Sequence, residues 1–325
     1  MPVAIREYPS GLVLWVVINN KVFETSSHKE RQGAEVDENN LKKALQRFQV
    51  DLRVWKNFKR QEILNALRDL CEEVDRDVYK FSGLVILGAS HGEERDNRDY
   101  LVASDGKGLL TETIVSLFHN DARIGLRDRP KCYLFNMCRG NNPNIRFEKY
   151  DAASLSLVND TIIADATETK ENLHCCGLDL SEDGFIVFEE DARRVHSEMI
   201  GSYANEIVSL PEVTKNNCKD EGVISFKKGD YMIVHSTLRG YVSNRHKYLG
   251  TIFVQELTKS IQELMRQENH SFEEVIRSAC FASSSHQSSG ENAPQVPEFI
   301  TTLRAPFRFV VKGNFKNTFF KNCLI

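Results

Sequence analysis

The 325-residue sequence has no long apolar stretch and little excess of charge of either sign. No run approaches the roughly 18 consecutive apolar residues that a membrane-spanning helix needs. Residues 1–7 lack the basic start and apolar core of a secretory signal. A net charge of −4 gives no overall attraction for nucleic acid or for an anionic membrane. We therefore expect a cytoplasmic protein with no membrane and no nucleic-acid partner.

Cysteine is too sparse for a disulfide framework. The eight cysteines are spread along the chain and form no Cys-x-x-Cys pair. His174, Cys175 and Cys176 are of metal-ligating types, but adjacent positions cannot all converge on one tetrahedral ion without a distant partner. We expect reduced thiols, no metal site and no cofactor.

The apolar residues follow strand-like and helix-like patterns in turn. Continuous apolar runs predict buried parallel strands at residues 11–18, 83–89, 132–135 and 231–236. Apolar spacings of three and four predict helices at residues 38–48, 59–79, 109–119, 249–265 and 272–281. This alternation predicts an α/β fold with a parallel sheet covered on both faces. In such folds functional residues gather at the carboxyl ends of the strands.

Two segments interrupt the alternation. Residues 141–222 are polar and acidic, with one helical candidate at 189–210, and are typical of an interdomain linker. Residues 282–297 are rich in serine, glutamine and proline, and predict a mobile surface loop.

A histidine and a cysteine follow two of the predicted strands. His91 lies just after the strand at 83–89, and Cys138 lies just after the strand at 132–135. Each residue alone is more often structural than catalytic. Together they predict acyl transfer, because a neighbouring imidazole activates a thiol as a nucleophile. Gly92 and the backbone N–H of Cys138 would supply donors to the oxyanion.

These features resemble the caspase family. His91 lies 47 residues before Cys138, and the caspase signature places its histidine about 50 residues upstream of the cysteine. Five segments carry the resemblance in the family's order, at residues 31–41, 90–94, 130–140, 235–245 and 295–303.

The resemblance implies a caspase-like three-layer α/β/α sandwich around a mostly parallel six-stranded sheet. It also implies three regions along the chain: a large-subunit-like region at 1–145, an acidic intersubunit linker at 146–222 and a small-subunit-like region at 223–325. A death-fold prodomain of the kind that initiator members carry is not expected before the first strand.

The resemblance further implies a cysteine endopeptidase that cuts proteins after aspartate. Arg31 and Arg245 would hold the substrate carboxylate, since a guanidinium makes two charge-assisted hydrogen bonds. Asn136 and Ser243 would complete the substrate site. Without the resemblance, each arginine would be interpreted as a solvated surface charge.

The sequence departs from the family pattern near the cysteine. Asn136 stands where the family usually has glutamine, and its amide reaches about 1.5 Å less far, the length of one C–C bond. Met137 replaces a small residue, and Asn244 stands where the family tends to place an aromatic one. The adjoining apolar subsite should therefore be more open or more polar.

Activation and assembly are also implied by the resemblance. Family members are made as zymogens and cut at aspartates in the linker, for which Asp165 is the first candidate here and Asp220 the second. We expect a homodimer, or a heterodimer with another caspase, formed through the apolar segment 299–311. A role in programmed cell death follows from the resemblance alone.

Two other functions remain open. One is a caspase-like pseudoenzyme or regulator that binds or dimerises with an active caspase, a function that would explain Asn136 and Asn244. The other is a cysteine peptidase of the same fold with another side-chain preference. Measuring peptide hydrolysis distinguishes a peptidase from the regulator. Acceptance of a basic or neutral residue at the cut site distinguishes the second peptidase from the aspartate-directed one.

Overall fold

The structure is a computed structural model that describes four segments of the chain. The described residues are 7–141, 229–264, 270–285 and 295–313. They belong to one unit, Met1–Arg146 with Ile224–Ile325. The predicted linker, its helical candidate at 189–210 and both candidate processing sites lie outside the described residues.

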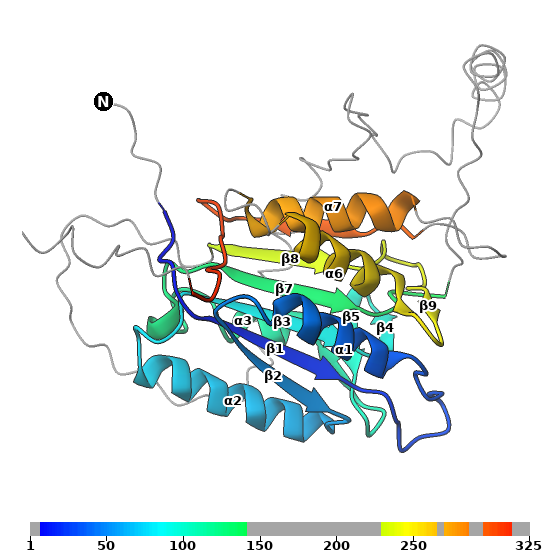
Figure 1. Cartoon of the computed structure of the whole chain (residues 1–325). Coiled ribbons are helices and arrows are strands. Elements are labelled where there is room, and N and C mark those ends of the chain that lie inside the picture. Colours follow the sequence, from blue (N-terminus) through cyan, green and yellow to red (C-terminus); the bar gives the residue numbers. More distant parts are fainter. Residues whose placement is uncertain (1–6, 142–228, 265–269, 286–294, 314–325) are drawn as a thin grey trace, which may run out of the picture. The chain divides into compact units, whose positions relative to one another are not determined.

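A six-stranded sheet forms the centre of this unit (Figure 1). In spatial order its strands are β11 (Glu298–Thr301), β8 (Tyr231–His235), β7 (Lys131–Asn136), β3 (Gly83–Ala89), β1 (Val13–Asn19) and β2 (Val50–Lys56). All pairings are parallel except that of β11 with β8. The central strands are buried on both faces, which explains their uninterrupted apolar sequences.

Helices cover both faces of the sheet, each over its own core. One face carries α1 (Ala34–Leu45), α6 (Ile252–Leu264) and α7 (Phe272–Ser285). The other carries α2 (Arg60–Arg76) and α3 (Thr111–Ser116). Side chains of β1 alternate between these cores, because successive residues of a strand point to opposite faces. The predicted three-layer sandwich around a mostly parallel six-stranded sheet is confirmed.

Several short elements were not predicted. A three-stranded antiparallel sheet is formed by β4 (Gly92–Arg95), β5 (Arg98–Val102) and β6 (Gly108–Leu110). A two-stranded hairpin is formed by β9 (Arg245–His246) and β10 (Gly250–Thr251), and η1 (Ile124–Leu126) is one turn of 3-10 helix. Segments this short contain too few residues for a clear apolar period.

Most predicted boundaries differ from the structure by a few residues, as at α1, which begins at Ala34 and ends at Leu45 where a helix at 38–48 was expected. Two differences have a clear cause. The helix expected at 109–119 is shorter, because residues 108–110 pair in β6 before α3 begins. The loop expected from residue 282 is wrong for residues 282–285, since α7 continues to Ser285 despite its serines. Two of these serines donate their hydroxyls to carbonyl groups one turn back, so the hydroxyls are satisfied within the helix: Ser283 to Ala279 and Ser284 to Cys280.

An aromatic cluster packs the C-terminal segment onto the sheet. Phe272, at the start of α7, lies with its ring centroid 5.6 Å from that of Trp15 in β1 and 5.0 Å from that of Phe309. Phe307 completes the cluster, 4.9 Å from Phe309. Edge-to-face and offset packing of this kind adds to the burial of the rings. The segment that follows β11 therefore belongs to the core.

We predict that Phe272→Ala lowers the free energy of unfolding by about 3–5 kcal/mol, because it leaves a cavity between Trp15 and Phe309. Urea denaturation followed by circular dichroism measures the change. The matched control is Phe281→Ala on the same helix, where the side chain is 60% exposed and the expected loss is below about 1 kcal/mol. Equal losses would contradict this account of the core.

Candidate active site

The site is built where β3 and β7 end side by side. These strands are parallel neighbours, and Ala89 is paired with Asn136 in their register. His91 and Cys138 each lie two residues beyond that last pair. Parallel pairing thus brings both to the carboxyl edge of the sheet, where open α/β sheets form their sites.

Gly92 permits the two strand ends to touch. A Cβ atom at this position would lie 2.1 Å from the carbonyl oxygen of Cys138 and 2.9 Å from the side chain of Met137. No side chain fits in that space. The glycine therefore allows the backbone after His91 to pack directly on the cysteine segment.

One ring nitrogen of His91 is fixed by the backbone. Nε2 lies 2.7 Å from the carbonyl oxygen of Lys29, so Nε2 carries the proton and donates it. Nδ1 of the neutral ring is then left as the proton acceptor. Burial lowers the pKa of His91, and the nearby charges of Arg31, Arg245 and His28 lower it further.

Aromatic rings hold His91 from one side. The ring of Phe23 lies 4.9 Å away and that of His28 lies 5.4 Å away, between centroids. Nε2 of His28 is 3.3 Å from Oε1 of Glu93. The loop between β1 and α1 thus supplies both the carbonyl acceptor and the packing for the imidazole.

Cys138 is the partly exposed thiol among the four described cysteines, since Cys71, Cys132 and Cys280 are buried. Its Sγ accepts a hydrogen bond from the Ser243 backbone N–H at 3.3 Å. The Ser243 hydroxyl is itself bonded to that of Ser236 at 2.8 Å. The segment that leads into β9 is therefore placed directly on the thiol.

Arg31 is buried beside the strand ends with its charge largely unmatched. Its side chain is 1% exposed, and Nη1 donates to the carbonyl oxygens of Asn20 at 2.9 Å and Ala89 at 3.0 Å. Nε has no partner. Burial and the charge of Arg245 lower the pKa of Arg31 to about 10.

Arg245 is the second cation of the site. It lies in β9 and is partly exposed, and burial lowers its pKa. Among the described residues, its guanidinium forms no hydrogen bond or ion pair. The charges of Arg31 and Arg245 act on each other and on Cys138. An anion that enters here would relieve the repulsion between two cations.

Asn136 ends β7 and is 1% exposed. Its Nδ2 donates to the hydroxyl of Thr251 at 2.8 Å, while its Oδ1 is buried without a partner. Thr251 in turn donates to the buried carboxylate of Asp37 at 3.0 Å. The Nδ2 group of Asn136 is therefore already engaged with Thr251.

Arg139 connects the cysteine segment to two other parts of the chain. It is buried, and its Nε and Nη2 donate to the carboxylate of Asp99 at 3.0 and 2.9 Å. It also forms an ion pair with Glu298, the first residue of β11. Cys138 is thus attached through its neighbour to β5 and to the edge strand.

Sequence reasoning missed several of these contributors. The role of Lys29 had no signal, because its backbone carbonyl makes the contact. No sequence pattern indicates the role of Thr251 either, since its partners come from distant segments. Asp37 and Asp99 gave no signal either, because Asp37 precedes the helix predicted at 38–48 and Asp99 lies in β5, which was not predicted.

The two candidate processing sites, Asp165 and Asp220, lie outside the described residues, and so does the sequence His174-Cys175-Cys176, where no metal site is expected. The described residues contain no group of three or more potential metal ligands. They also contain no helix long and apolar enough to cross a bilayer.

A family model described as "Caspase domain" matches residues 13–308, most of the chain. This chain belongs to the caspase family.

Individual caspases show the same relationship at low identity. The chain is similar to Caspase-6 of Gallus gallus, 23% identical over 233 residues, 71% of this chain and 57% of that protein. It is similar to Caspase-3 of Bos taurus, 28% identical over 135 residues, 41% of this chain and 46% of that protein. The chain thus spans about half the length of the curated relatives it matches.

A solved caspase structure confirms the predicted caspase fold. The structure of Caspase-1 from Spodoptera frugiperda has a TM-score of 0.63 at 18% identity, and the match covers 97% of this chain and 98% of that one. At this identity the likeness concerns the fold, so the individual site residues must be argued from their own contacts.

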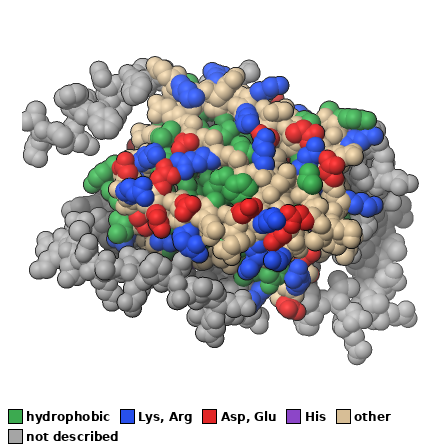
Figure 2. All heavy atoms as spheres, turned by 90° about the horizontal axis from the view of Figure 1, so that it is seen from below, with side chains coloured by type: hydrophobic (Ala, Val, Ile, Leu, Met, Phe, Trp, Pro, Cys, Tyr) green, Lys and Arg blue, Asp and Glu red, His purple; other side chains and the backbone are tan. Residues whose placement is uncertain are grey.

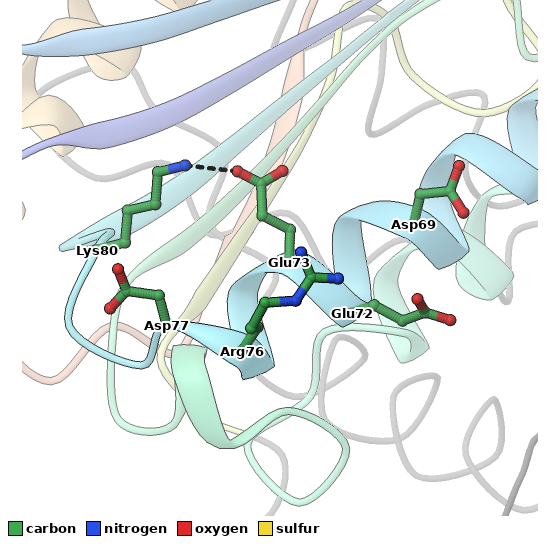
Figure 3. A pocket seen from close by; sticks show the side chains of 6 residues that line it. All are labelled: Asp69, Glu72, Glu73, Arg76, Asp77 and Lys80. Carbon is green, nitrogen blue, oxygen red and sulfur yellow. Dashed lines mark hydrogen bonds and ion pairs between the residues drawn. The ribbon is translucent and has the colours of Figure 1, made fainter.

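A surface hollow elsewhere offers no comparable chemistry. It has a volume of about 570 Å³ and lies at the C-terminal end of α2, where Figure 3 shows the side chains that line it. Glu73 in this hollow is paired with Lys80 at 2.7 Å and with Arg53 at 2.6 Å. The face in Figure 2 likewise mixes basic and acidic side chains. The carboxylate of Glu73 is thus matched by two basic side chains, whereas the cations beside Cys138 have no acid in direct contact.

We predict that Gly92→Ala slows alkylation of Cys138 by iodoacetamide by about tenfold or more, because the new methyl group separates the strand ends. Peptide-resolved mass spectrometry measures the rate, since it distinguishes Cys138 from the other cysteines. Ser90→Ala, which removes a hydroxyl bonded to Val102 O at 2.5 Å, is the neighbouring control and should keep most of the rate. An unchanged rate in Gly92→Ala would contradict the close contact.

Proposed function

We propose that this protein is a cysteine endopeptidase that cuts proteins after aspartate. One observation carries the proposal: a partly exposed thiol lies within the field of two arginines that have no acidic partner in direct contact. A thiol supplies the nucleophile, and the paired cations supply a site for a carboxylate side chain. Membership of the caspase family supports both roles.

The proposed reaction proceeds by acyl transfer. Sγ of Cys138 attacks the scissile carbonyl carbon, and its proton passes to Nδ1 of His91. The backbone N–H groups of Gly92 and Cys138 donate to the oxyanion. The imidazolium then gives the proton to the departing amine, and water hydrolyses the thioester to restore the thiol. The bond from Nε2 to Lys29 O keeps the ring oriented through these steps.

The proposed specificity is electrostatic. Arg31 and Arg245 bind the substrate carboxylate, while the backbone at Ser243 lies along the peptide. A substrate with a neutral side chain would leave buried Arg31 and partly buried Arg245 without a ligand carboxylate, a penalty of several kcal/mol, so selectivity of about 10³ or more is expected.

Activation and assembly belong to the same proposal. The chain would be a zymogen with large-subunit-like and small-subunit-like regions at 1–145 and 223–325, cut in the 146–222 linker at Asp165 or Asp220. β11 pairs with β8 along one side, and we infer that its other side joins a second copy or another caspase. We place this activity in the cytoplasm and in programmed cell death on the strength of family membership.

A second function is favoured by one contact. Nδ2 of Asn136 is bonded to Thr251 rather than left open for a ligand. A regulator with little turnover, which binds or dimerises with an active caspase, would tolerate this arrangement. The test of the first function therefore includes it as an outcome.

We predict that the purified protein, with its linker cut, hydrolyses fluorogenic peptides ending in aspartate and that Cys138→Ala abolishes this. Arg245→Ala should lower kcat/KM by about 100-fold or more, because it removes half of the carboxylate clamp. Arg68→Ala is the control, since Arg68 is an exposed residue of α2 whose guanidinium donates to Asn65 on the same helix.

The outcomes separate the candidate functions. Turnover of aspartate peptides that depends on Cys138 and Arg245 supports the peptidase. Equal turnover of peptides ending in a basic or neutral residue would refute the aspartate preference. A folded, cut protein that is no faster than Cys138→Ala on any peptide would refute the peptidase and favour the regulator.

A further inference from the structure

A buried carboxylate lies beside the two arginines of the proposed substrate site. Asp37, in α1, is 4% exposed, and its charge acts on Arg31 and Arg245. All three side chains are described, yet neither arginine forms a hydrogen bond or ion pair with this carboxylate. The site therefore contains an anion of its own that neutralises the cations from a distance.

Thr251 holds both oxygens of this carboxylate. Its backbone N–H donates to Oδ1 of Asp37 at 2.8 Å, and its hydroxyl donates to Oδ2 at 3.0 Å. The same hydroxyl accepts from Nδ2 of Asn136 at 2.8 Å. Because a hydroxyl has one proton, Asn136, Thr251 and Asp37 form a hydrogen-bond chain with one direction. Asn136 donates to Thr251, and Thr251 donates to Asp37.

This direction leaves one end of the chain unsatisfied. Oδ1 of Asn136 is buried without a donor, and a buried polar atom without a partner costs free energy. If the amide turned over, its oxygen would accept from Thr251 and its NH₂ group would take the unpartnered position. That NH₂ group would then be available to a carboxylate.

Asp37 cannot respond by moving away. Gly250 has φ +87°, and a Cβ atom there would lie 2.1 Å from Oδ1 of Asp37, so the backbone closes directly over the carboxylate. The charged groups that act on Asp37 are Arg31, which precedes α1, and Arg245 in β9; both favour the ionised form. Burial outweighs them and raises the pKa of Asp37 to about 6.

We propose that Asp37 is the internal counter-ion of the substrate site, and that it takes up a proton when a ligand carboxylate enters beside Arg31 and Arg245. The inference rests on the proposed function, whose carboxylate site it deepens. A proton from solvent binds Oδ2 of Asp37, which then donates to the Thr251 hydroxyl. That hydroxyl donates to Oδ1 of Asn136, and Nδ2 is released towards the ligand.

The driving force is competition between two carboxylates for one pair of cations. Two carboxylates that share a buried site cannot both stay ionised at low cost, so the arrival of one raises the pKa of the other. The ligand brings one negative charge and the proton one positive charge, so the net charge of the site is unchanged. Asp37 and Thr251 act as positioning residues, because neither needs to touch the reacting atoms.

The test measures proton uptake on binding of a peptide that ends in an aspartate aldehyde. Isothermal titration calorimetry on the full chain with its linker cut, in two buffers of different ionisation enthalpy at pH 7.5, counts the protons. Wild type should take up close to one proton more than Asp37→Asn. Asparagine at 37 keeps the acceptor for the Thr251 N–H and always donates to the hydroxyl, so it mimics the protonated chain.

Affinity gives a second readout. Since the folded pKa of Asp37 is about 6, the carboxylate is mostly ionised above that pH and must be protonated on binding. Wild-type affinity should therefore fall by about tenfold per pH unit above about pH 6, relative to Asp37→Asn. At pH 7.5 the variant should bind about tenfold or more tightly than wild type.

Glu38→Gln is the matched control. Glu38 is the next residue of α1 and is also buried, but it is paired with Lys42 and with Lys56. This variant should take up as many protons as wild type. A change of the same size as in Asp37→Asn would overturn the inference.

A second pair of variants, at Thr251, tests the hydrogen-bond chain even if Asp37→Asn fails to fold. Thr251→Val removes the hydroxyl and should remove the extra proton uptake, while Thr251→Ser should restore it. The side-chain NH₂ signals of Asn136 in ¹⁵N NMR should shift on ligand binding in the serine variant but much less in the valine variant. A valine variant that behaves as wild type would overturn the inference.

The outcomes also separate this inference from the proposed function. Tight, aspartate-selective binding with equal proton uptake in wild type and Asp37→Asn, or weaker binding by Asp37→Asn, refutes the counter-ion and leaves the peptidase standing. Wild type that binds the matched asparagine aldehyde as tightly as the aspartate aldehyde refutes the carboxylate site, and the counter-ion falls with it.

Discussion

The parallel pairing of β3 with β7 is the constraint on which the rest of the site depends. It places Ala89 opposite Asn136, and the chain then turns towards the same edge from both strands. The missing side chain of Gly92 lets these turns touch. A slip of one residue in the register would turn the buried side chains of β7 to the wrong face. The two-sided apolar core therefore fixes the relative position of His91 and Cys138.

One electrostatic field serves both the proposed chemistry and the proposed specificity. Arg31 is almost wholly buried and is supported by backbone carbonyl oxygens rather than by an acid. With Arg245 it lowers the pKa of His91 and acts on Cys138. A carboxylate ligand that neutralises these cations would also change the environment of the catalytic pair. The charge of Asp37 acts on both arginines from within the protein.

The cysteine segment is anchored at a distance by Arg139. This guanidinium is buried between Asp99 of β5 and Glu298 of β11. A buried ion pair is costly to break, because it leaves a charge without a partner. The edge strand, the antiparallel sheet and Cys138 therefore have linked positions. The region before residue 142 and the region after residue 228 meet in this contact and in the pairing of β7 with β8.

The amino-acid sequence alone predicted the layered fold and its central strands, and it placed His91 and Cys138 just beyond two of those strands as a predicted catalytic pair. Apolar periodicity is a local pattern, so it can be found without knowing the fold. A glycine-flanked motif just after a predicted strand indicates a position at the carboxyl edge of a parallel sheet. Only folding brings Lys29, Thr251 and Asp37 into their contacts. The structure also shows that the amide of Asn136 donates to Thr251. A backbone carbonyl, a hydroxyl and a buried acid acquire their roles from partners in distant segments. Their hydrogen bonds and charge interactions therefore exist only once the sheet has formed.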